Sequence, residues 1–243
     1  MRIVAEGLDH RAINEMLHAE DGSFTVEGCM GQRFIAAGMS GCDISITGVP
    51  GNALGAYLNG ASITVMGNAQ DAVGDTMNAG RIVVHGSIGD AVGYAMRGGS
   101  ILVKGDAGYR AGIHMKEYKD KSPLLVIGGC AGSFLGEYQA GGTIVVLGMS
   151  ERHGAAQRKI VGNFPCTGMH GGRMFLRSDC SGIAFPGQVT ARPAEGYELE
   201  ELRGILSEFC MVFGYDIGSV LGAPFTVVAP DSANLYQQMY VTN

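Results

Sequence analysis

Residues 62–80 read SITVMGNAQDAVGDTMNAG, residues 81–99 read RIVVHGSIGDAVGYAMRGG, and residues 100–115 read SILVKGDAGYRAGIHM. The three segments repeat with a period of 19 residues, and each begins with a short apolar run that a glycine closes. Aligned on this glycine, the pattern extends to seven units, closed by Gly28, Gly48, Gly67, Gly86, Gly105, Gly128 and Gly148. A fixed period of this length is typical of solenoids, in which each repeat buries its apolar face by stacking on its neighbours.

Apolar residues alternate within the run that precedes each closing glycine. The positions four before it are Phe24, Ile44, Ile63, Ile82, Ile101, Leu124 and Ile144, and those two before it are Val26, Ile46, Val65, Val84, Val103, Val126 and Val146. This spacing, together with the β-branched side chains, predicts strands. The residues between strands are too few for crossover helices. The sequence therefore predicts an all-β solenoid, a right-handed parallel β-helix of about seven coils.

A second pattern, G-x2-G-x3-G, predicts where each coil turns. Gly86, Gly89 and Gly93 are one example of it. We expect these glycines at corners that need a positive φ or a close approach of two backbones. Two further interior columns follow from the same alignment: Leu54, Val73, Val92, Ala111 and Leu135, then Leu58, Met77, Met96, Met115 and Gln139. The mixed-charge segment Lys116–Lys121 lengthens one unit and predicts a solvated loop.

The flanks of the repeat divide the chain into three parts. Residues 1–20 are predicted to form an N-terminal cap helix that Asp9 caps, residues 21–185 the β-helix, and residues 186–243 an appendage. Met174–Leu176 is predicted to be a last strand, and Pro186 and Pro193 to bound a linker. Apolar residues spaced three and four apart predict an amphipathic helix over Tyr197–Phe213. We expect the remaining tail to be extended.

Composition excludes several classes of protein. The 243 residues include 40 Gly, and their formal net charge of −6 gives no basic surplus for binding nucleic acid. The sequence has no apolar run long enough for a membrane helix and no signal-peptide pattern at its start. Its six cysteines form no CxxC pair. They predict buried thiols in a reducing compartment, and we expect a cytoplasmic protein with no membrane partner.

The same residues predict no catalytic, cofactor-binding or metal-binding site on this chain. The glycine spacing differs from the dinucleotide fingerprint, and no helix follows the glycines. The outward strand positions hold no pair of acids. A catalytic His170 would need an adjacent nucleophile or acid, and Cys166 and Cys180 are possible neighbours that nothing in the sequence places beside it. The six histidines lack the spacing of metal ligands. We expect His170 at a cap or an interface.

One face of the predicted solenoid becomes apolar toward its C-terminal coils. Val83, Leu102, Leu125 and Val145 share one outward offset, and Ile127 and Leu147 extend the patch sideways. Monomers seldom expose such a patch, so we predict that it is covered. The cover is either the chain's own helix at Tyr197–Phe213 or a partner subunit. The full set of candidate interface residues is Val83, Leu102, Leu125, Ile127, Val145, Leu147, His170 and Arg173.

Three segments resemble the C-terminal domain of the glutamate synthase large subunit, in the form of a free-standing subunit. The first is GSIGDAVGYAMRGG at residues 86–99 with its neighbouring repeats, and the second is TGMHGGRMFLR at Thr167–Arg177. The third is the ending, which carries Pro224, Phe225, Thr226, Pro230, Tyr236 and Tyr240. One departure lies in this tail, where Asn234-Leu235-Tyr236 replaces the Arg-Pro-Tyr that the family often carries.

The resemblance implies a scaffold subunit without an active site of its own. Its partners would be a glutaminase subunit of the class II amidotransferase type and an FMN-dependent synthase subunit. FMN and iron–sulfur clusters would sit on those partners, and the complex would move glutamine amide nitrogen reductively to a 2-oxo acid. Alternatives are a β-helix subunit of a formylmethanofuran dehydrogenase or of an N-methylglutamate synthase-like complex. A self-contained enzyme or ligand-binding solenoid also stays open.

Overall fold

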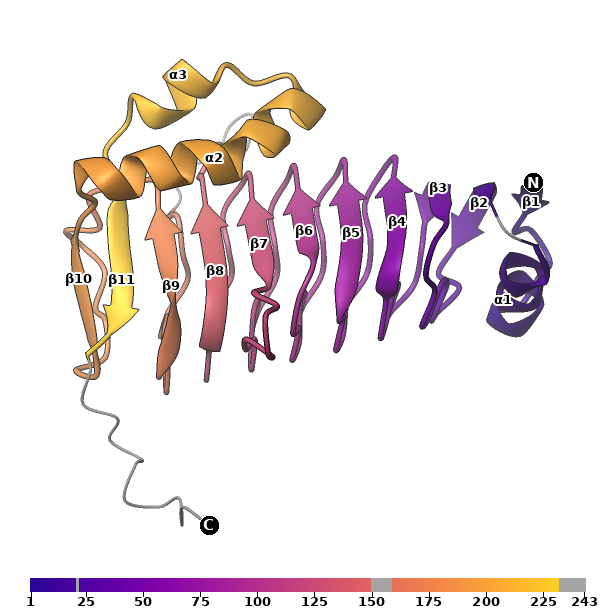
Figure 1. Ribbon diagram of the computed structural model, residues 1–243, viewed down its shortest axis with the longest axis horizontal. Coiled ribbons are helices and arrows are strands. Elements are labelled where there is room, and N and C mark those ends of the chain that lie inside the picture. The colour runs from indigo at the N-terminus through magenta and orange to yellow at the C-terminus, as the bar shows by residue number, and fades with distance from the viewer. Residues whose placement is uncertain (21, 150–158, 232–243) are drawn as a thin grey trace, which may run out of the picture.

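The computed structural model of the chain describes residues 1–20, 22–149 and 159–231. Its strands form one sheet that winds along a single axis, as Figure 1 shows, in the order β1-β2-β3-β4-β5-β6-β7-β8-β9-β11-β10. The strands of the repeat are β2 (Ser23–Met30), β3 (Asp43–Val49), β4 (Asn59–Val65), β5 (Ala79–Val84), β6 (Ser100–Val103), β7 (Leu124–Ile127), β8 (Ala140–Val146) and β9 (Gly171–Leu176). The predicted β-helix is confirmed, and β9 adds one coil to the seven that the glycines mark.

Each strand of the repeat pairs in parallel with the equivalent strand of the next coil. Ile44 pairs with Ile63, and Ile63 pairs with Ile82, so like side chains stack in inward columns. Both predicted interior columns are buried as well, and Met77, Met96 and Met115 have no exposed surface. Methionine fits such an irregular interior because its side chain is unbranched and flexible.

The register of β7 corrects one part of the sequence alignment. Leu125 pairs with Ile101 and with Ile144, so Leu125 and Ile127 point into the solenoid, whereas Leu124 and Val126 lie on the outward side. The equivalent of Gly105 is Gly129, not Gly128, because the Gly129 amide donates to the Gly105 carbonyl at 2.9 Å. The loop insertion is therefore one residue longer than the glycine spacing indicated. A slip of one residue exchanges the two faces of a strand.

The glycines of the G-x2-G-x3-G pattern act in the two ways that the sequence predicts. The third glycine of each unit has a φ between 64° and 69°, for example in Gly74 and Gly93. The second glycine lies against the preceding coil, and a Cβ on Gly108 would be 2.8 Å from the Gly89 carbonyl carbon. Any side chain at Gly108 would push the two coils apart.

The N-terminal end of the solenoid is closed by β1 (Arg2–Val4), which pairs with β2, and by α1 (His10–Ala19). Asp9 caps α1 as predicted, because its carboxylate accepts from the amides of Arg11 and Ala12. Ile13 and Leu17 of this helix are buried in the core. Met16, on the same helix, is 39% exposed.

The C-terminal end is closed by an antiparallel pair. Strand β11 (Thr226–Pro230) pairs with β9, and β10 (Val189–Pro193) pairs with β11 as the outermost strand. The predicted linker between Pro186 and Pro193 is therefore wrong in its second half, which is a strand. Pro193 is compatible with this position, since an edge strand leaves one row of its amides unpaired. The tail that carries Tyr236 and Tyr240 lies outside the described residues.

The predicted amphipathic helix is α2 (Gly196–Phe213), and a short helix, α3 (Ile217–Leu221), follows it. Figure 1 shows α2 running along the solenoid above the C-terminal coils, roughly across the direction of the strands. Over the C-terminal coils, the chain thus has two packed layers: the stack of coils and the helix α2 that covers it. The helix decides which outward residues of the solenoid stay accessible.

Candidate functional site

The outward apolar patch of the solenoid is covered by the chain's own helix. Leu202, Leu206 and Phe209 of α2 are fully buried against it, in one cluster with solenoid residues that include Val83, Leu102, Val126, Val145, Leu147 and Phe175. Val83 is 2% exposed, and Leu102, Val145 and Leu147 have no exposed surface. Of the two covers that the sequence left open, the structure therefore shows the helix. The prediction that these residues contact a partner subunit is wrong, since the helix occupies their surface.

Leu125 and Ile127 were also predicted to be outward interface residues, and this prediction is wrong for a different reason. Both side chains belong to the solenoid interior and have no exposed surface. Their place in the apolar ladder is taken by Val126, which packs with the residues under α2. The physical reason is the register of β7, which the length of the preceding loop sets.

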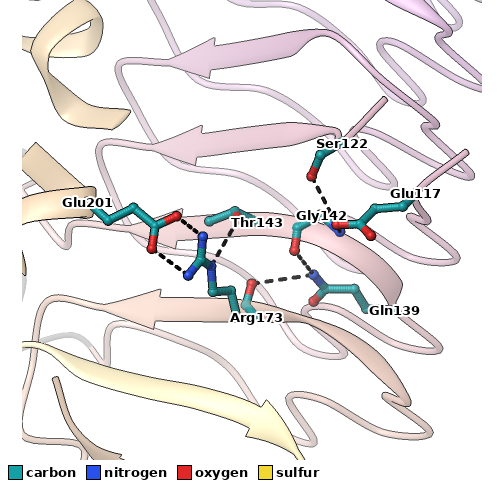
Figure 2. Close-up of polar contacts among 7 residues, drawn as sticks. All are labelled: Glu117, Ser122, Gln139, Gly142, Thr143, Arg173 and Glu201. Carbon is teal, nitrogen blue, oxygen red and sulfur yellow. Dashed lines mark hydrogen bonds and ion pairs between the residues drawn. The ribbon is translucent and has the colours of Figure 1, made fainter. Parts of the chain in front are cut away.

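Arg173 fastens the first half of α2 to the solenoid, as Figure 2 shows. Its guanidinium forms a bidentate ion pair with Glu201, and the Nη1–Oε2 distance is 2.6 Å. The Arg173 Nε donates to Thr143 Oγ1 at 3.4 Å, and the guanidinium lies 5.5 Å from the ring centre of Phe175. Arg173 is thus an internal contact between two elements of this chain. Its side chain is still 34% exposed, so a partner contact of Arg173 stays a prediction.

The other end of α2 meets the middle of the solenoid. Arg81 of β5 forms an ion pair with Glu208 at 2.7 Å. The ring of Phe213 packs edge-on against His85, with centroids 5.2 Å apart. Burial, with a further contribution from Lys104, lowers the pKa of His85 and favours the neutral imidazole in this contact.

The start of α2 is held by a buried carboxylate. Glu198 is 5% exposed and accepts two hydrogen bonds of 2.8 Å from the Arg192 guanidinium of β10. The same carboxylate accepts from the amide of Glu195, which completes a capping box at the helix start. Hydrogen bonding to Arg192 is the main reason why the pKa of Glu198 lies below its usual value.

Gln139 places a polar group inside the solenoid, in the column that Met77, Met96 and Met115 occupy in earlier coils. Its Nε2 donates to the carbonyls of Gly141 and Gly142 at 3.2 Å and of Arg173 at 3.4 Å. Figure 2 shows the insertion loop beside this group: Glu117 accepts from Ser122 Oγ at 3.1 Å and from the Gly142 amide at 3.3 Å. The loop is therefore anchored to the β8 corner and not only solvated.

His170 lies just before β9, where its side chain is exposed. The ring Nδ1 is 3.0 Å from the Gly168 carbonyl oxygen. The structure does not bring His170 into the contacts that Arg173 makes with α2. A role of His170 at an interface stays a prediction.

Aromatic side chains gather at one corner of the C-terminal coils, and the sequence did not predict this corner. All of them are exposed except Phe134, which is half-buried. This aromatic corner consists of Tyr94, Tyr109, His114, Phe134, Tyr138 and Phe164. His114 stacks on Tyr138 with centroids 5.2 Å apart, and Phe134 contacts Phe164 at 5.4 Å. Arg110 lies 5.0 Å from the ring centre of Phe134 and forms an ion pair with Glu137. Tyr, Phe and Arg are enriched where proteins meet.

A sequence signal for the aromatic corner exists. Arg110 and His114 stand two residues before and after the third glycine of their unit, and Phe134 and Tyr138 do so in the next unit. All four have a left-handed backbone, with φ between 52° and 62°. At these two positions the side chains lie outside the inward columns, so aromatic residues there in successive units indicate a ridge on the outside of the coils.

A family model described as the GXGXG motif matches residues 22–231, which include every coil described above. The chain belongs to the GXGXG motif family. This is the family of the C-terminal domain of the glutamate synthase large subunit, and the resemblance seen in the sequence is confirmed.

Two relatives extend this comparison. An uncharacterized protein of Methanocaldococcus jannaschii, MJ1350, is 39% identical over 249 residues, which cover 98% of this chain and 95% of that protein. A chain of the formyltransferase/hydrolase complex of Methylorubrum extorquens, solved with methylofuran, superposes with a TM-score of 0.62 at 20% identity. That superposition covers 84% of this chain and 71% of the other, and it shows that the fold is shared.

Further observations concern the described residues alone. No three His, Cys, Asp or Glu side chains among them lie close enough together to hold a metal ion. No helix among them is long and apolar enough to cross a membrane. All six cysteines are buried, and no disulfide joins them.

Proposed function

We propose that this protein is a scaffold subunit of a multi-subunit complex of the oxidoreductase type, without an active site of its own. The observation that carries this proposal is the match of residues 22–231 to the GXGXG motif family. The packing of the molecule is consistent with such a role, because its stacked coils form one continuous core. A solenoid of this kind offers an extended and regular surface for other subunits.

Within this class, our first candidate is a complex of the glutamate synthase type. The complex would release ammonia from the amide of glutamine and deliver it reductively to a 2-oxo acid. A class II amidotransferase subunit would perform the first step, and an FMN-dependent subunit with iron–sulfur clusters the second. This chain would hold the two partners together and would carry neither cofactor. We place the complex in the cytoplasm, since six buried cysteines without disulfides suit a reducing compartment.

The second candidate is a subunit of a formyl-transferring complex. It is favoured by one observation, the superposition on a chain of the formyltransferase/hydrolase complex of Methylorubrum extorquens. At 20% identity this likeness concerns the fold, so it supports the candidate less directly than the family match does.

Proteins that co-purify with the chain from its native host distinguish the two candidates. We expect a tagged chain to retain a class II amidotransferase and a flavoprotein, and the purified assembly to form glutamate from glutamine and 2-oxoglutarate. Recovery of formyltransferase or hydrolase subunits instead would replace the first candidate by the second. A chain that stays monomeric in the native extract would contradict the scaffold role altogether.

The aromatic corner is the face that we assign to partner contact. Tyr138→Ser removes a ring from the centre of this set, and we expect the partners to be lost while the solenoid stays folded. Tyr57→Ser is a matched control, because Tyr57 is exposed and occupies the equivalent position of an earlier coil, outside the set. Equal retention of partners by both variants would assign the contact to another face.

A further inference from the structure

A cavity of about 320 Å³ opens at the C-terminal end of the solenoid, beside the loop that follows β9. Lys159 lies before the last coil, Arg177 follows β9, and both line this cavity. A neighbouring hollow of about 190 Å³ shares Lys159 and Ile183 with it, so the space is elongated. Its total size suits a small molecule better than a single water.

The two cations in this cavity have no carboxylate partner among the described residues. Arg177 donates from Nε to the Val220 carbonyl at 2.8 Å and from Nη2 to the Ser219 carbonyl at 3.3 Å. These carbonyls of α3 hold the guanidinium in place, but they carry no formal charge to neutralise it. Lys159 is exposed, and no hydrogen bond or ion pair to another described residue accompanies its ammonium group.

Among the described residues, the one carboxylate that lines the cavity is already engaged. Asp179 Oδ1 accepts from the Ser181 amide at 3.1 Å and from the Ser181 hydroxyl at 3.2 Å. The Cys180 thiol also lines the cavity, and it stays neutral because burial raises its pKa. Counted over the described lining residues, Lys159 and Arg177 against Asp179 leave an excess of positive charge in a chain whose overall formal charge is −6.

Apolar side chains line the cavity beside these charges. Leu147 at the end of β8 and Ile160 beside Lys159 belong to it, and both are buried. A ligand that fits therefore has an anionic end and a short carbon chain. We propose that this cavity binds a small organic anion, whose carboxylate or phosphate group lies between Lys159 and Arg177. The carbon chain of the ligand packs on Leu147 and Ile160.

Such a ligand would connect the last coil to α3 through Arg177, so it would stabilise the C-terminal cap. Binding to the folded chain raises the melting temperature with ligand concentration. The attraction is electrostatic in part, so it weakens as salt is added. This site is independent of the proposed scaffold function, since neither cation belongs to α2 contacts or to the aromatic corner.

Isothermal titration of the full chain tests the site with three probes: inorganic phosphate, the dicarboxylate glutarate, and its neutral diamide glutaramide. We expect saturable binding of glutarate or phosphate at about one site per chain, and none of glutaramide. Binding of phosphate alone assigns the phosphate class, and binding of glutarate alone the carboxylate class. Glutaramide that binds as well as glutarate, or the absence of saturable binding by either anion at ~1 mM, overturns the proposal.

Lys159→Met removes one charge from the exposed rim and keeps the fold. We expect the affinity for the bound anion to fall about tenfold. Lys116→Met is the matched control, because Lys116 is also exposed but lies on the insertion loop. An equal loss of affinity in both variants, or in neither, would show that the anion binds elsewhere.

Discussion

The same strand repeat builds the whole outward face of the solenoid, yet the two halves of this face differ. One half is polar and uncovered, and the other is apolar and lies under α2. Over the first coils, the outward column carries Thr25, Ser45 and Thr64, and none of the described helices covers it. Over the later coils the same column continues through Val83, Leu102, Val126, Val145 and Phe175, which lie under α2. The inward columns hardly change between the halves. The identity of the outward residue therefore decides where the helix packs.

The boundary between the halves is sharp, and polar contacts mark it. Arg81 of β5 pairs with Glu208 of α2, and it also lines a hollow of about 300 Å³ on the polar half, together with Ser45 and Thr64. Moving one coil further back would place α2 over hydroxyl groups and bury them without partners. Such burial costs free energy that apolar packing does not return.

The largest effect is expected from a charge placed under the helix. Leu102→Asp buries a carboxylate in the cluster beneath α2, and we expect the chain to lose its stable fold. Thr64→Asp puts the same group on the half-exposed polar half, where the expected change is within about 0.5 kcal/mol. Urea unfolding followed by circular dichroism measures both. A folded and stable Leu102→Asp variant would show that α2 is not held by this face.

The second prediction compares the two sides of β7. Leu125→Ala opens a cavity inside the solenoid, so the free energy of unfolding should fall by about 2–5 kcal/mol. Leu124→Ala removes a half-buried side chain from the outward side, for which we expect a smaller loss of about 1 kcal/mol. The reverse order would support the register that the glycine spacing indicated and contradict the paired strands.

Glu198→Gln loosens the start of α2, the helix that covers the apolar half. The pKa of Glu198 is lowered in the folded chain, so its ionised form contributes stability above the unfolded value of about 4.3. That contribution is lost as the pH falls through the lower folded pKa. At neutral pH we expect the variant to lose about 1–3 kcal/mol of unfolding free energy. The difference from the wild type should shrink in acid, and a constant difference would contradict the ion pair with Arg192.

The smallest effect concerns His85, at the boundary of the two halves. Its pKa is lowered in the folded chain, so the neutral ring contributes stability above the unfolded value of about 6.5. That contribution decreases as the pH falls toward the lower folded pKa. Because the side chain is half-exposed, we expect less than about 0.5 kcal/mol. Melting temperatures of His85→Gln and wild type should diverge slightly between about pH 7.5 and 5.5. If the melting temperatures of the two proteins change in parallel with pH, the contact between His85 and Phe213 contributes no pH-dependent stability, contrary to this prediction.

Much of the fold could be predicted because the repeat can be recognised from the amino-acid sequence alone. The two inward positions of each strand are apolar in every unit, and the glycines mark corners at a nearly constant distance. Local rules therefore act many times and agree with one another. The same alignment failed at β7, because Gly128 and Gly129 are adjacent and either one can close the strand. Only the pairing with β6 and β8 selects between them.

The candidate site was less accessible from the sequence. The apolar outward column was visible, but the residues that cover it lie in α2, from a few tens to more than a hundred positions further along the chain. Arg173 illustrates the difficulty, because neither its own position nor that of Glu201 indicates that the two meet. The aromatic corner was missed because its residues are few in each unit and gather only when the coils stack.

The sequence by itself determined that this chain is a stack of β-coils of the GXGXG type, since period, alternation and glycine spacing act within one unit or between neighbouring units. Tertiary structure decided what faces outward: the register after the insertion, the cover that α2 provides, the aromatic corner and the cavity between Lys159 and Arg177. These features depend on contacts between distant segments. Their free energies come from the fit of two surfaces, which no single stretch of sequence contains.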